Sequence, residues 1–178
     1  MVVATDANCC QLSKTVTLTE PTDIVLVSTD TTLVSCNGDA NGEFVVVASG
    51  GVPSYSFVWS NGDIDPILNA VGVCVYEVIV TDINGCLDSL ELEMTEPTAL
   101  DVAVLQTTDV TCFNDDGGSA TIDASGGVSP YDYSWITIGQ NTQTASDLSA
   151  GDYIYEVTDA NGCAVTDTVE ILQPDQII

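Results

Sequence analysis

The chain has 178 residues, a formal net charge of −26, one basic side chain (Lys14) and no histidine. Binding to nucleic acid or to an anionic membrane surface needs clustered Lys and Arg, so both are excluded as partners. Because 45% of the residues are hydrophobic, we expect the chain to fold around apolar cores and to place its acids in solvent.

The chain has seven cysteines, in sequence that predicts small β domains. Cysteines at repeating positions in small β domains are typical of an oxidising compartment, so we expect a secreted protein. No stretch approaches the roughly 20 consecutive apolar residues of a membrane helix, and no signal peptide opens the chain. Because strand-like sequence follows Met1 directly, we expect a piece of a longer protein.

The sequence repeats internally, which points to an array of similar domains. One motif occurs three times and another occurs twice, with 76 to 77 residues between matching positions. The first motif covers Val2–Thr22, Val78–Thr98 and Tyr155–Asp175, and the second covers Ser35–Gly62 and Thr111–Gly139.

This spacing predicts the domain organisation. Residues 1–22 are expected to be the C-terminal part of a preceding repeat, 23–98 and 99–175 two complete repeats, and 176–178 the start of a following repeat. The junctions are short and contain proline, which limits bending. We therefore expect a semi-rigid rod in which each repeat chiefly contacts its neighbours.

Period-two alternation and glycine-rich turns predict strands throughout, without helical periodicity. Six or seven short strands in about 76 residues indicate an all-β fold of tandem immunoglobulin-like sandwiches in an extended array. For the second complete repeat, the predicted strands in chain order are Asp101–Gln106, Ser119–Ala124, Tyr131–Ile136, Thr142–Leu148, Tyr153–Thr158 and Ala164–Leu172.

Each complete repeat has a row of alternating aromatic residues, at Tyr55–Trp59 and at Tyr131–Trp135. Alternate residues of a strand share one face, so we expect these rows to face the core. The alternative is an exposed platform for sugar rings. The expected core aromatics are Trp59, Trp135, Tyr76 and Tyr153.

Taken together, these motifs resemble a known repeat. Their order is Cys-x-Gly, Ser-Gly-Gly-x-x-x-Tyr-x-x-x-Trp, Gly-x-Tyr, Val-Thr-Asp-x-Asn-Gly-Cys and Glu-Pro-Thr, which is similar to the SprB repeat over nearly the whole chain. That repeat occurs in giant surface adhesins of gliding bacteria that use type-nine secretion, and also in surface proteins that do not drive gliding. The resemblance implies an Ig-like or PKD-like fold, export through the outer membrane and a role in cell adhesion or gliding motility.

Five cysteines recur with the repeat and are disulfide candidates. One pairing joins Cys36 to Cys86 and Cys112 to Cys163, and leaves Cys10 to an upstream partner. A rival pairing across the junctions joins Cys10 to Cys36 and Cys86 to Cys112, and leaves Cys163 to a later repeat. Spacing does not separate the two, because both recur with the repeat. We favour the first, since a bridge within one small sandwich closes a long loop and contributes roughly 3 to 4 kcal/mol.

Cys9 and Cys74 are additional to the repeat pattern. Cys9 replaces the glycine of Asn-Gly-Cys, and Cys74 replaces the glycine of Gly-x-Tyr. Buried or unpaired thiols are the simpler interpretation. The alternative is an inter-domain or inter-chain clip, since the two loops are expected at opposite ends of a domain and head-to-tail stacking would bring such ends together.

Two acidic loops offer the oxygen ligands that calcium prefers. Neither loop has the EF-hand spacing, so solvated turns are the simpler interpretation and calcium is the only candidate cofactor. The candidate calcium ligands are Asp39, Glu43, Asp115 and Asp116.

Three short motifs of Asp followed by Ser or Thr and then an apolar residue or Thr are similar to the O-glycosylation signal of the same bacterial group. The candidate acceptor hydroxyls are those of Thr31, Ser89 and Thr168.

Catalysis has little support in the sequence. Without histidine there is no Ser-His-Asp or Cys-His pair, and there is no Cys-x-x-Cys zinc pair, so we expect no enzyme. We expect a segment of an extracellular bacterial adhesin whose partners are neighbouring repeats, surface polysaccharide or other copies of the chain. The alternatives are a subunit of an extracellular fibre or coat, and an accessory module of a larger secreted enzyme.

Overall fold

The computed structural model describes residues 1–176, and within them every regular element is a β-strand. This confirms the all-β fold. In that range no helix is long and apolar enough to cross a membrane. Residues 176–178 were expected to begin a following repeat. Of these, residues 177 and 178 lie outside the described part of the chain.

The first domain is a sandwich of two three-stranded antiparallel sheets, ordered β3-β4-β6 and β5-β7-β8. Phe44 and Leu68 of one sheet and Trp59 and Val78 of the other are at most 2% exposed and share one core. The strands are β3 (Val25–Thr32), β4 (Gly42–Ser49), β5 (Ser56–Trp59), β6 (Ile67–Val71), β7 (Cys74–Thr81) and β8 (Leu87–Met94).

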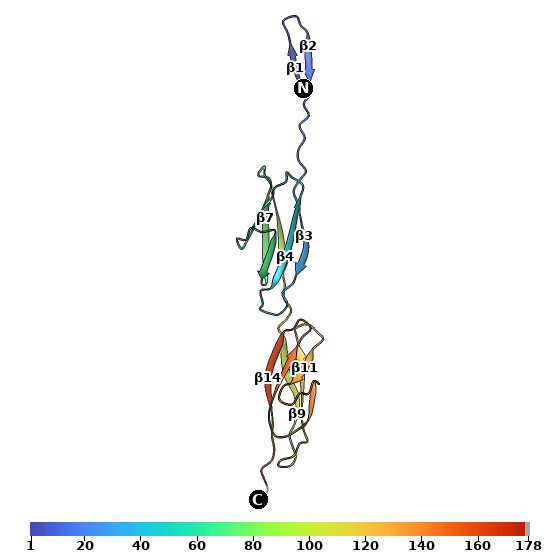
Figure 1. Cartoon of the computed structure of the whole chain (residues 1–178), viewed down its shortest axis with the longest axis vertical. Helices are drawn as coiled ribbons and strands as arrows, with labels where there is room; N and C mark the ends of the chain where they lie inside the picture. Colours follow the sequence, from blue (N-terminus) through green and yellow to red (C-terminus); the bar gives the residue numbers. More distant parts are fainter. Residues whose placement is uncertain (177–178) are drawn as a thin grey trace.

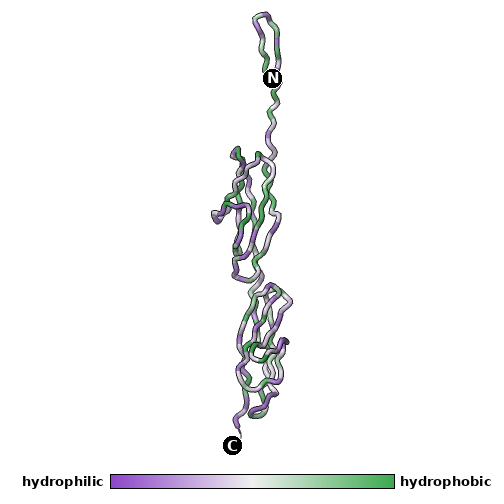
Figure 2. The backbone as a smooth tube through the Cα atoms, in the orientation of Figure 1, coloured by the Kyte–Doolittle hydropathy of each residue, from purple (hydrophilic) through white to green (hydrophobic). Residues whose placement is uncertain are grey.

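The second domain repeats this topology, with sheets ordered β9-β10-β12 and β11-β13-β14. Ile122 and Leu148 of one sheet meet Trp135 and Tyr155 of the other in a second core. The strands are β9 (Asp101–Thr108), β10 (Gly118–Ser125), β11 (Asp132–Trp135), β12 (Thr144–Leu148), β13 (Gly151–Thr158) and β14 (Ala164–Ile171). Figure 2 shows apolar segments along the strands of both domains.

The aromatic rows face the cores. The indole Nε1 of Trp59 donates to the Asp65 carbonyl at 2.8 Å, and that of Trp135 donates to the Thr142 carbonyl at 2.9 Å. Tyr153 is buried and Tyr76 packs, half-buried, against the first core. Since both indoles are buried, neither row forms an exposed platform for sugar rings.

The domains lie end to end (Figure 1). A separate hairpin of β1 (Val2–Thr5) and β2 (Gln11–Lys14) lies beyond the first domain, and an extended segment joins the two. The hairpin pairs Thr5 with Gln11, just as β7 pairs Thr81 with Leu87. It therefore reproduces the end of one domain without the rest.

Candidate functional site

A tight turn with a buried aspartate joins the last two strands of the first domain. The turn runs from Asp82 to Cys86, and Asp82 is 5% exposed. Its Oδ1 accepts the backbone N–H groups of Asn84 and Cys86, both at 2.9 Å. Its Oδ2 accepts the N–H of Val52 at 2.9 Å. One carboxylate thus fixes both the turn and the neighbouring loop.

The second domain builds the same turn between β13 and β14. Asp159 is buried and accepts the N–H groups of Asn161 and Cys163 at 2.9 Å and that of Val128 at 2.8 Å. We call the matching segments 6–10, 82–86 and 159–163 the Asp turns.

Both buried aspartates are held in the ionised form. The N–H donated by Val52, followed by those of the turn, lowers the pKa of Asp82. Burial alone would raise the pKa of Asp159, but N–H donation from Val128 and from the turn outweighs it, so this pKa is lowered too. Hydrogen bonds to the charged form are the expected cause of such shifts.

The Asp turn of the N-terminal hairpin has the same two hydrogen bonds within the turn. Asp6 accepts the N–H groups of Asn8 and Cys10 at 2.9 Å. Cys9 has a φ of 64°, the left-handed conformation that Gly85 adopts in the first domain. The substitution that departs from the repeat therefore retains the turn, with a side chain in a conformation that favours glycine.

At the opposite end of the first domain, a loop that we call the cysteine loop (residues 35–39) holds the linker to the second domain. The Glu96 carboxylate accepts the side-chain amide of Asn37 at 2.8 Å and the N–H of Gly38 at 2.6 Å. Asn37 also donates to the Pro97 carbonyl at 3.1 Å. These bonds set the direction in which the chain leaves the domain.

The cysteine loop of the second domain, residues 111–115, repeats part of this arrangement. The side-chain carbonyl of Gln173, at the position of Glu96, accepts the N–H of Asn114 at 3.1 Å. Phe113 takes the place of Asn37 and is 39% exposed.

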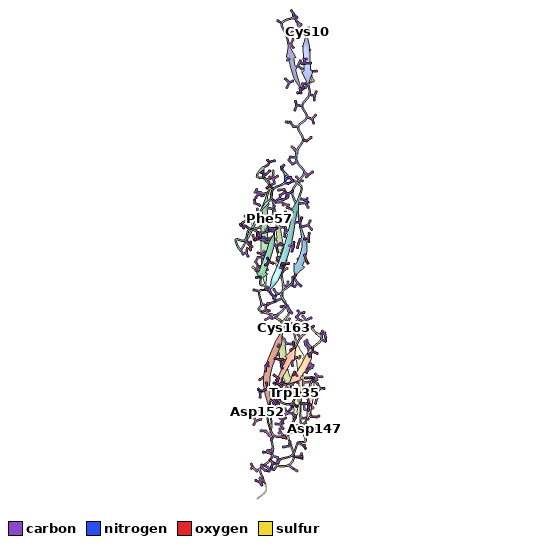
Figure 3. All side chains as sticks on the ribbon, viewed as in Figure 1. Cys10, Phe57, Trp135, Asp147, Asp152 and Cys163 are labelled. Carbon is purple, nitrogen blue, oxygen red and sulfur yellow. A yellow bond between two sulfur atoms is a disulfide. The ribbon has the colours of Figure 1, made fainter. Side chains whose placement is uncertain are left out.

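The two domains meet where the cysteine loop of the first contacts the Asp turn of the second. Cys36 and Cys163 form a disulfide there, with their Cα atoms 5.7 Å apart. The Asn161 amide donates to the Ser35 carbonyl at 2.9 Å. Cys163 lies at the boundary between the domains (Figure 3). The junction therefore has two covalent connections, the linker and the disulfide.

This disulfide corrects both pairings expected from the sequence. Cys36 and Cys86 lie at opposite ends of the first domain, separated by the eight residues of β8. Such a strand spans about 26 Å, whereas the Cα atoms of a disulfide lie within roughly 7 Å. Cys112 and Cys163 are separated in the same way. The rival Cys86–Cys112 pairing fails because these cysteines lie at the two outer ends of the pair of domains.

The other cysteines have no disulfide within residues 1–176. All are exposed, including the two that depart from the repeat pattern. Cys74 begins β7, opposite Met94 and hence at the end of the domain away from its Asp turn. The free cysteines are Cys9, Cys10, Cys74, Cys86 and Cys112.

The candidate calcium ligands do not lie close enough to other carboxylates or cysteines to form a metal site. In the described part of the chain, no group of three or more Cys, Asp or Glu side chains is placed to hold a metal ion. Asp39 and Asp116 are exposed, and Glu43 and Asp115 are half-buried.

The candidate glycosylation sites are exposed residues of strands β3, β8 and β14. Each backbone N–H, of Thr31, Ser89 and Thr168, is bonded to the carboxylate of the preceding aspartate, at 2.7 to 2.9 Å. Ser89 and Thr168 are paired with the exposed Ile79 and Ile154, so their hydroxyl groups lie on outer sheet faces. Thr31 is paired with the buried Phe44 instead, and its hydroxyl lies 3.3 Å from that of Ser28.

Sequence reasoning missed the residues that build the junction. Asp82 and Asp159 stand in Val-Thr-Asp-x-Asn-Gly-Cys, which reads as a solvated hairpin turn, yet both are buried anchors. Recurrence of the aspartate in all three copies of the motif was the available signal. Glu96, which accepts hydrogen bonds from the cysteine loop, could have been found in the same way. A polar residue precedes the linker proline in every copy of the motif.

Among solved structures, three show distant similarity to the chain. A structure on the basis of Dscam isoform specificity is 15% identical, with a TM-score of 0.35, and the match covers 80% of this chain and 42% of that one. A 282-residue C-terminal fragment of intimin, in complex with the intimin-binding domain of the translocated intimin receptor, is 16% identical with a TM-score of 0.43, covering 86% and 64%. The Dpr2 Ig1-Ig2 structure, in complex with DIP-Theta Ig1-Ig3, is 12% identical with a TM-score of 0.34, covering 85% and 66%.

The chain thus spans between 42% and 66% of the length of these structures. No curated protein is significantly similar to it in sequence. The profile of the SprB repeat matches residues 28–64 and 104–140, which lie in the first and second domains and include Cys36 and Cys112. The chain therefore contains two matches to the SprB repeat, one in each of its two domains.

Proposed function

We propose that this chain is a stalk segment of a secreted bacterial adhesin, and that its role is mechanical and adhesive, not catalytic. The observation that carries the proposal is the junction: two SprB-repeat domains joined end to end by a linker and by the Cys36–Cys163 disulfide. A disulfide between domains persists in an oxidising compartment, which supports a location outside the cell.

The shape supports the same role. Domains stacked along one axis extend a distal binding site away from a surface (Figure 1). They also repeat any weak contact of a single domain many times, and multivalency raises avidity a hundredfold or more without a strong single site. Surface polysaccharide is the proposed ligand class. The net charge of −26 keeps such an array soluble.

Labelling of live cells tests the proposal. An antibody raised against residues 23–175 is expected to label intact, unpermeabilised cells of the bacterium that produces the chain. An antibody against a cytoplasmic protein serves as the control and should label only permeabilised cells. Label restricted to permeabilised cells would contradict the proposal. Label that moves along the cell body would assign the stalk to gliding motility, whereas stationary label would assign it to static attachment.

A second candidate function is a subunit of an extracellular fibre or coat. The exposed thiols of Cys9 and Cys74, which depart from the repeat pattern, favour it. Non-reducing gels of the protein from the cell surface decide the matter. Covalent oligomers that vanish on reduction and in the Cys9→Ser/Cys74→Ser variant support the fibre, and a monomer band under both conditions argues against it.

A further inference from the structure

Both outer ends of the two-domain unit carry one half of the junction that joins its domains. The end of the first domain near the hairpin has an Asp turn with a free, exposed Cys86. The far end of the second domain has a cysteine loop with a free, exposed Cys112. These are the counterparts of Cys163 and Cys36, which are bonded to each other.

The Asp turn that carries the free Cys86 has the same structure as the Asp turn that carries the bonded Cys163. Asp82 holds Cys86 and Asn84 by the same two N–H bonds with which Asp159 holds Cys163 and Asn161. Asn161 uses its side-chain amide to bond the partner loop. Asn84 is exposed and matches it in sequence, so this end presents the same donor and the same thiol.

The free cysteine loop also matches the one in use. Asn114 has a φ of 60° and donates its N–H to the linker residue Gln173, as Gly38, with a φ of 83°, donates to Glu96. The loop carrying Cys112 is therefore fixed to its own C-terminal linker, and a domain following that linker would begin beside this thiol.

Exposed apolar residues lie next to both free cysteines in the sequence. Ile83 and Leu87 flank Cys86 and are 68% and 69% exposed, and Phe113 follows Cys112 and is 39% exposed. At the joined Asp turn, the counterparts of Ile83 and Leu87 are alanines. The two large exposed side chains beside Cys86 indicate a face that another domain covers.

Pockets show the same correspondence. At the junction, a hollow is lined by Cys36, Cys163 and the linker residue Leu100. At the free end of the first domain, a hollow of about 430 Å³ is lined by Cys86 and by Ile24, which matches Leu100 in the repeat. The free hollow is thus the same end face without the preceding cysteine loop.

We propose that Cys86 and Cys112 are docking sites for flanking repeats of the same kind, and that every junction of the array is closed by a disulfide from the cysteine loop of one repeat to the Asp turn of the next. Cys112 pairs with the Asp-turn cysteine of a following repeat, and Cys86 pairs with the cysteine-loop residue of a preceding one. Cys10, in the Asp turn of the hairpin, pairs in the same way one repeat earlier.

The bond forms by thiol–disulfide exchange with a disulfide oxidant, for which oxidised glutathione serves as the probe. A thiolate of one loop attacks a glutathione sulfur and releases one reduced glutathione. The second thiolate then attacks the protein sulfur of the mixed disulfide and releases the other. Two thiols lose two protons and two electrons in all, and the oxidant becomes two molecules of reduced glutathione.

Two extended chains test the proposal. The first continues residue 178 with a second copy of residues 102–178, in which Thr111→Ser marks the copied Cys112 peptide and Ala164→Ser marks the copied Cys163 peptide. The second places a copy of residues 23–76 before Met1, which completes the repeat that ends at residue 22, and Thr32→Ser marks the copied Cys36 peptide. Both are refolded in oxidised and reduced glutathione, alkylated and cleaved before aspartate. The single Lys14 makes tryptic mapping useless, whereas cleavage before aspartate places Cys36, Cys86, Cys112 and Cys163 in separate peptides.

In the first extended chain, we expect the Cys112 peptide to be linked to the marked copy of the Cys163 peptide. In the second, we expect the Cys86 peptide to be linked to the added copy of the Cys36 peptide. The unextended chain is the control and should show both cysteines alkylated. The gain in β-sheet circular dichroism over the unextended chain reports the folding of each added domain. The proposal is overturned if the added domains are folded while Cys86 and Cys112 stay alkylated or pair elsewhere. Because this readout is chemical, it does not depend on whether the protein is an adhesin.

Discussion

Cys36 and Cys163 are 127 residues apart in sequence, and their sulfur atoms are bonded across the boundary between two separately folded cores. The bond closes a loop that contains most of both domains. It therefore links the stability of the second domain to the presence of the first, which the linker alone does not do.

Removal of this disulfide should loosen the junction and destabilise the second domain. In the Cys36→Ser/Cys163→Ser variant, the unfolded second domain is no longer tethered at a second point, and the chain-entropy model assigns a closed loop of this length up to about 5 kcal/mol. Calorimetry should show a lower Tm for the second domain, and small-angle scattering a broader range of inter-domain angles. Cys74→Ser, at an exposed and unpaired thiol, is the control. Equal scattering profiles for the two variants would show that the linker alone holds the domains in line.

Truncation of the second indole should unfold one domain and leave the other intact. Trp135 is fully buried, so Trp135→Ala is expected to cost about 3 to 5 kcal/mol. Ile136, the next residue, is 55% exposed, and Ile136→Ala should change stability by less than about 0.5 kcal/mol. Denaturant unfolding followed by circular dichroism measures both. Trp59 then serves as the only fluorescent indole and reports the first domain. A loss of the Trp59 transition would mean that the cores do not unfold independently.

Acid should weaken the fold through the Asp turns. Because the folded pKa of Asp82 is lowered, its ionised form stabilises the fold above its unfolded pKa of about 3.9, and this stabilisation is lost as the pH falls through the folded pKa. Asp82→Asn replaces one acceptor oxygen with an amide. We expect a lower Tm at neutral pH and a smaller further loss of Tm in acid.

Asp152→Asn is the control for the acid effect, since Asp152 is exposed on β13 (Figure 3). Both variants remove one negative charge, so both reduce the repulsion between carboxylates by a similar amount. That repulsion also decreases in acid, as the other carboxylates are protonated. If the Tm of both variants has the same pH dependence in calorimetry, Asp82 does not carry the acid sensitivity.

The Ser-Gly-Gly motif should tolerate no side chain at Gly126. This residue has a φ of 71°, and a Cβ there would collide with the Ala99 carbonyl at the start of the domain. Gly139 has a φ of 70° with open space around it, so Gly139→Ala should cost only the left-handed backbone term of about 1 to 2 kcal/mol. Gly126→Ala adds steric overlap of about 1 to 3 kcal/mol. Denaturation midpoints of the two variants compare these effects directly. Equal midpoints would show that the chain near Ala99 moves aside at little cost.

Much of the fold was predictable from the sequence because local and repeated signals agree. Apolar residues alternate in β10 of the second domain, and their burial alternates in the same way as in β4 of the first. The strand predicted at Thr142–Leu148 is present as β12, Thr144–Leu148. Every strand signal is confirmed by its copy one repeat away, so errors in one copy are corrected by the other.

The junction was not predictable in the same way. Pairings within a repeat, across a linker and between a cysteine loop and the next Asp turn all recur with one period. Only the three-dimensional position of each loop, at one end of a sandwich or the other, distinguishes them. Asp82 presents a similar difficulty, since a charged residue in an Asn-Gly turn is expected in solvent until Val52 is seen to donate to it.

The two covalent connections at the junction have a consequence for rotation about the long axis. A single peptide linker acts as a swivel, since torsion about its backbone bonds lets one domain spin relative to the next. The Cys36–Cys163 bond and the linker residues Ala99 and Leu100 line the same hollow, so the bond is a second connection beside the linker and restricts that rotation. A rod with such a junction transmits torque as well as tension, so a turn imposed at one end reaches the other end as a turn.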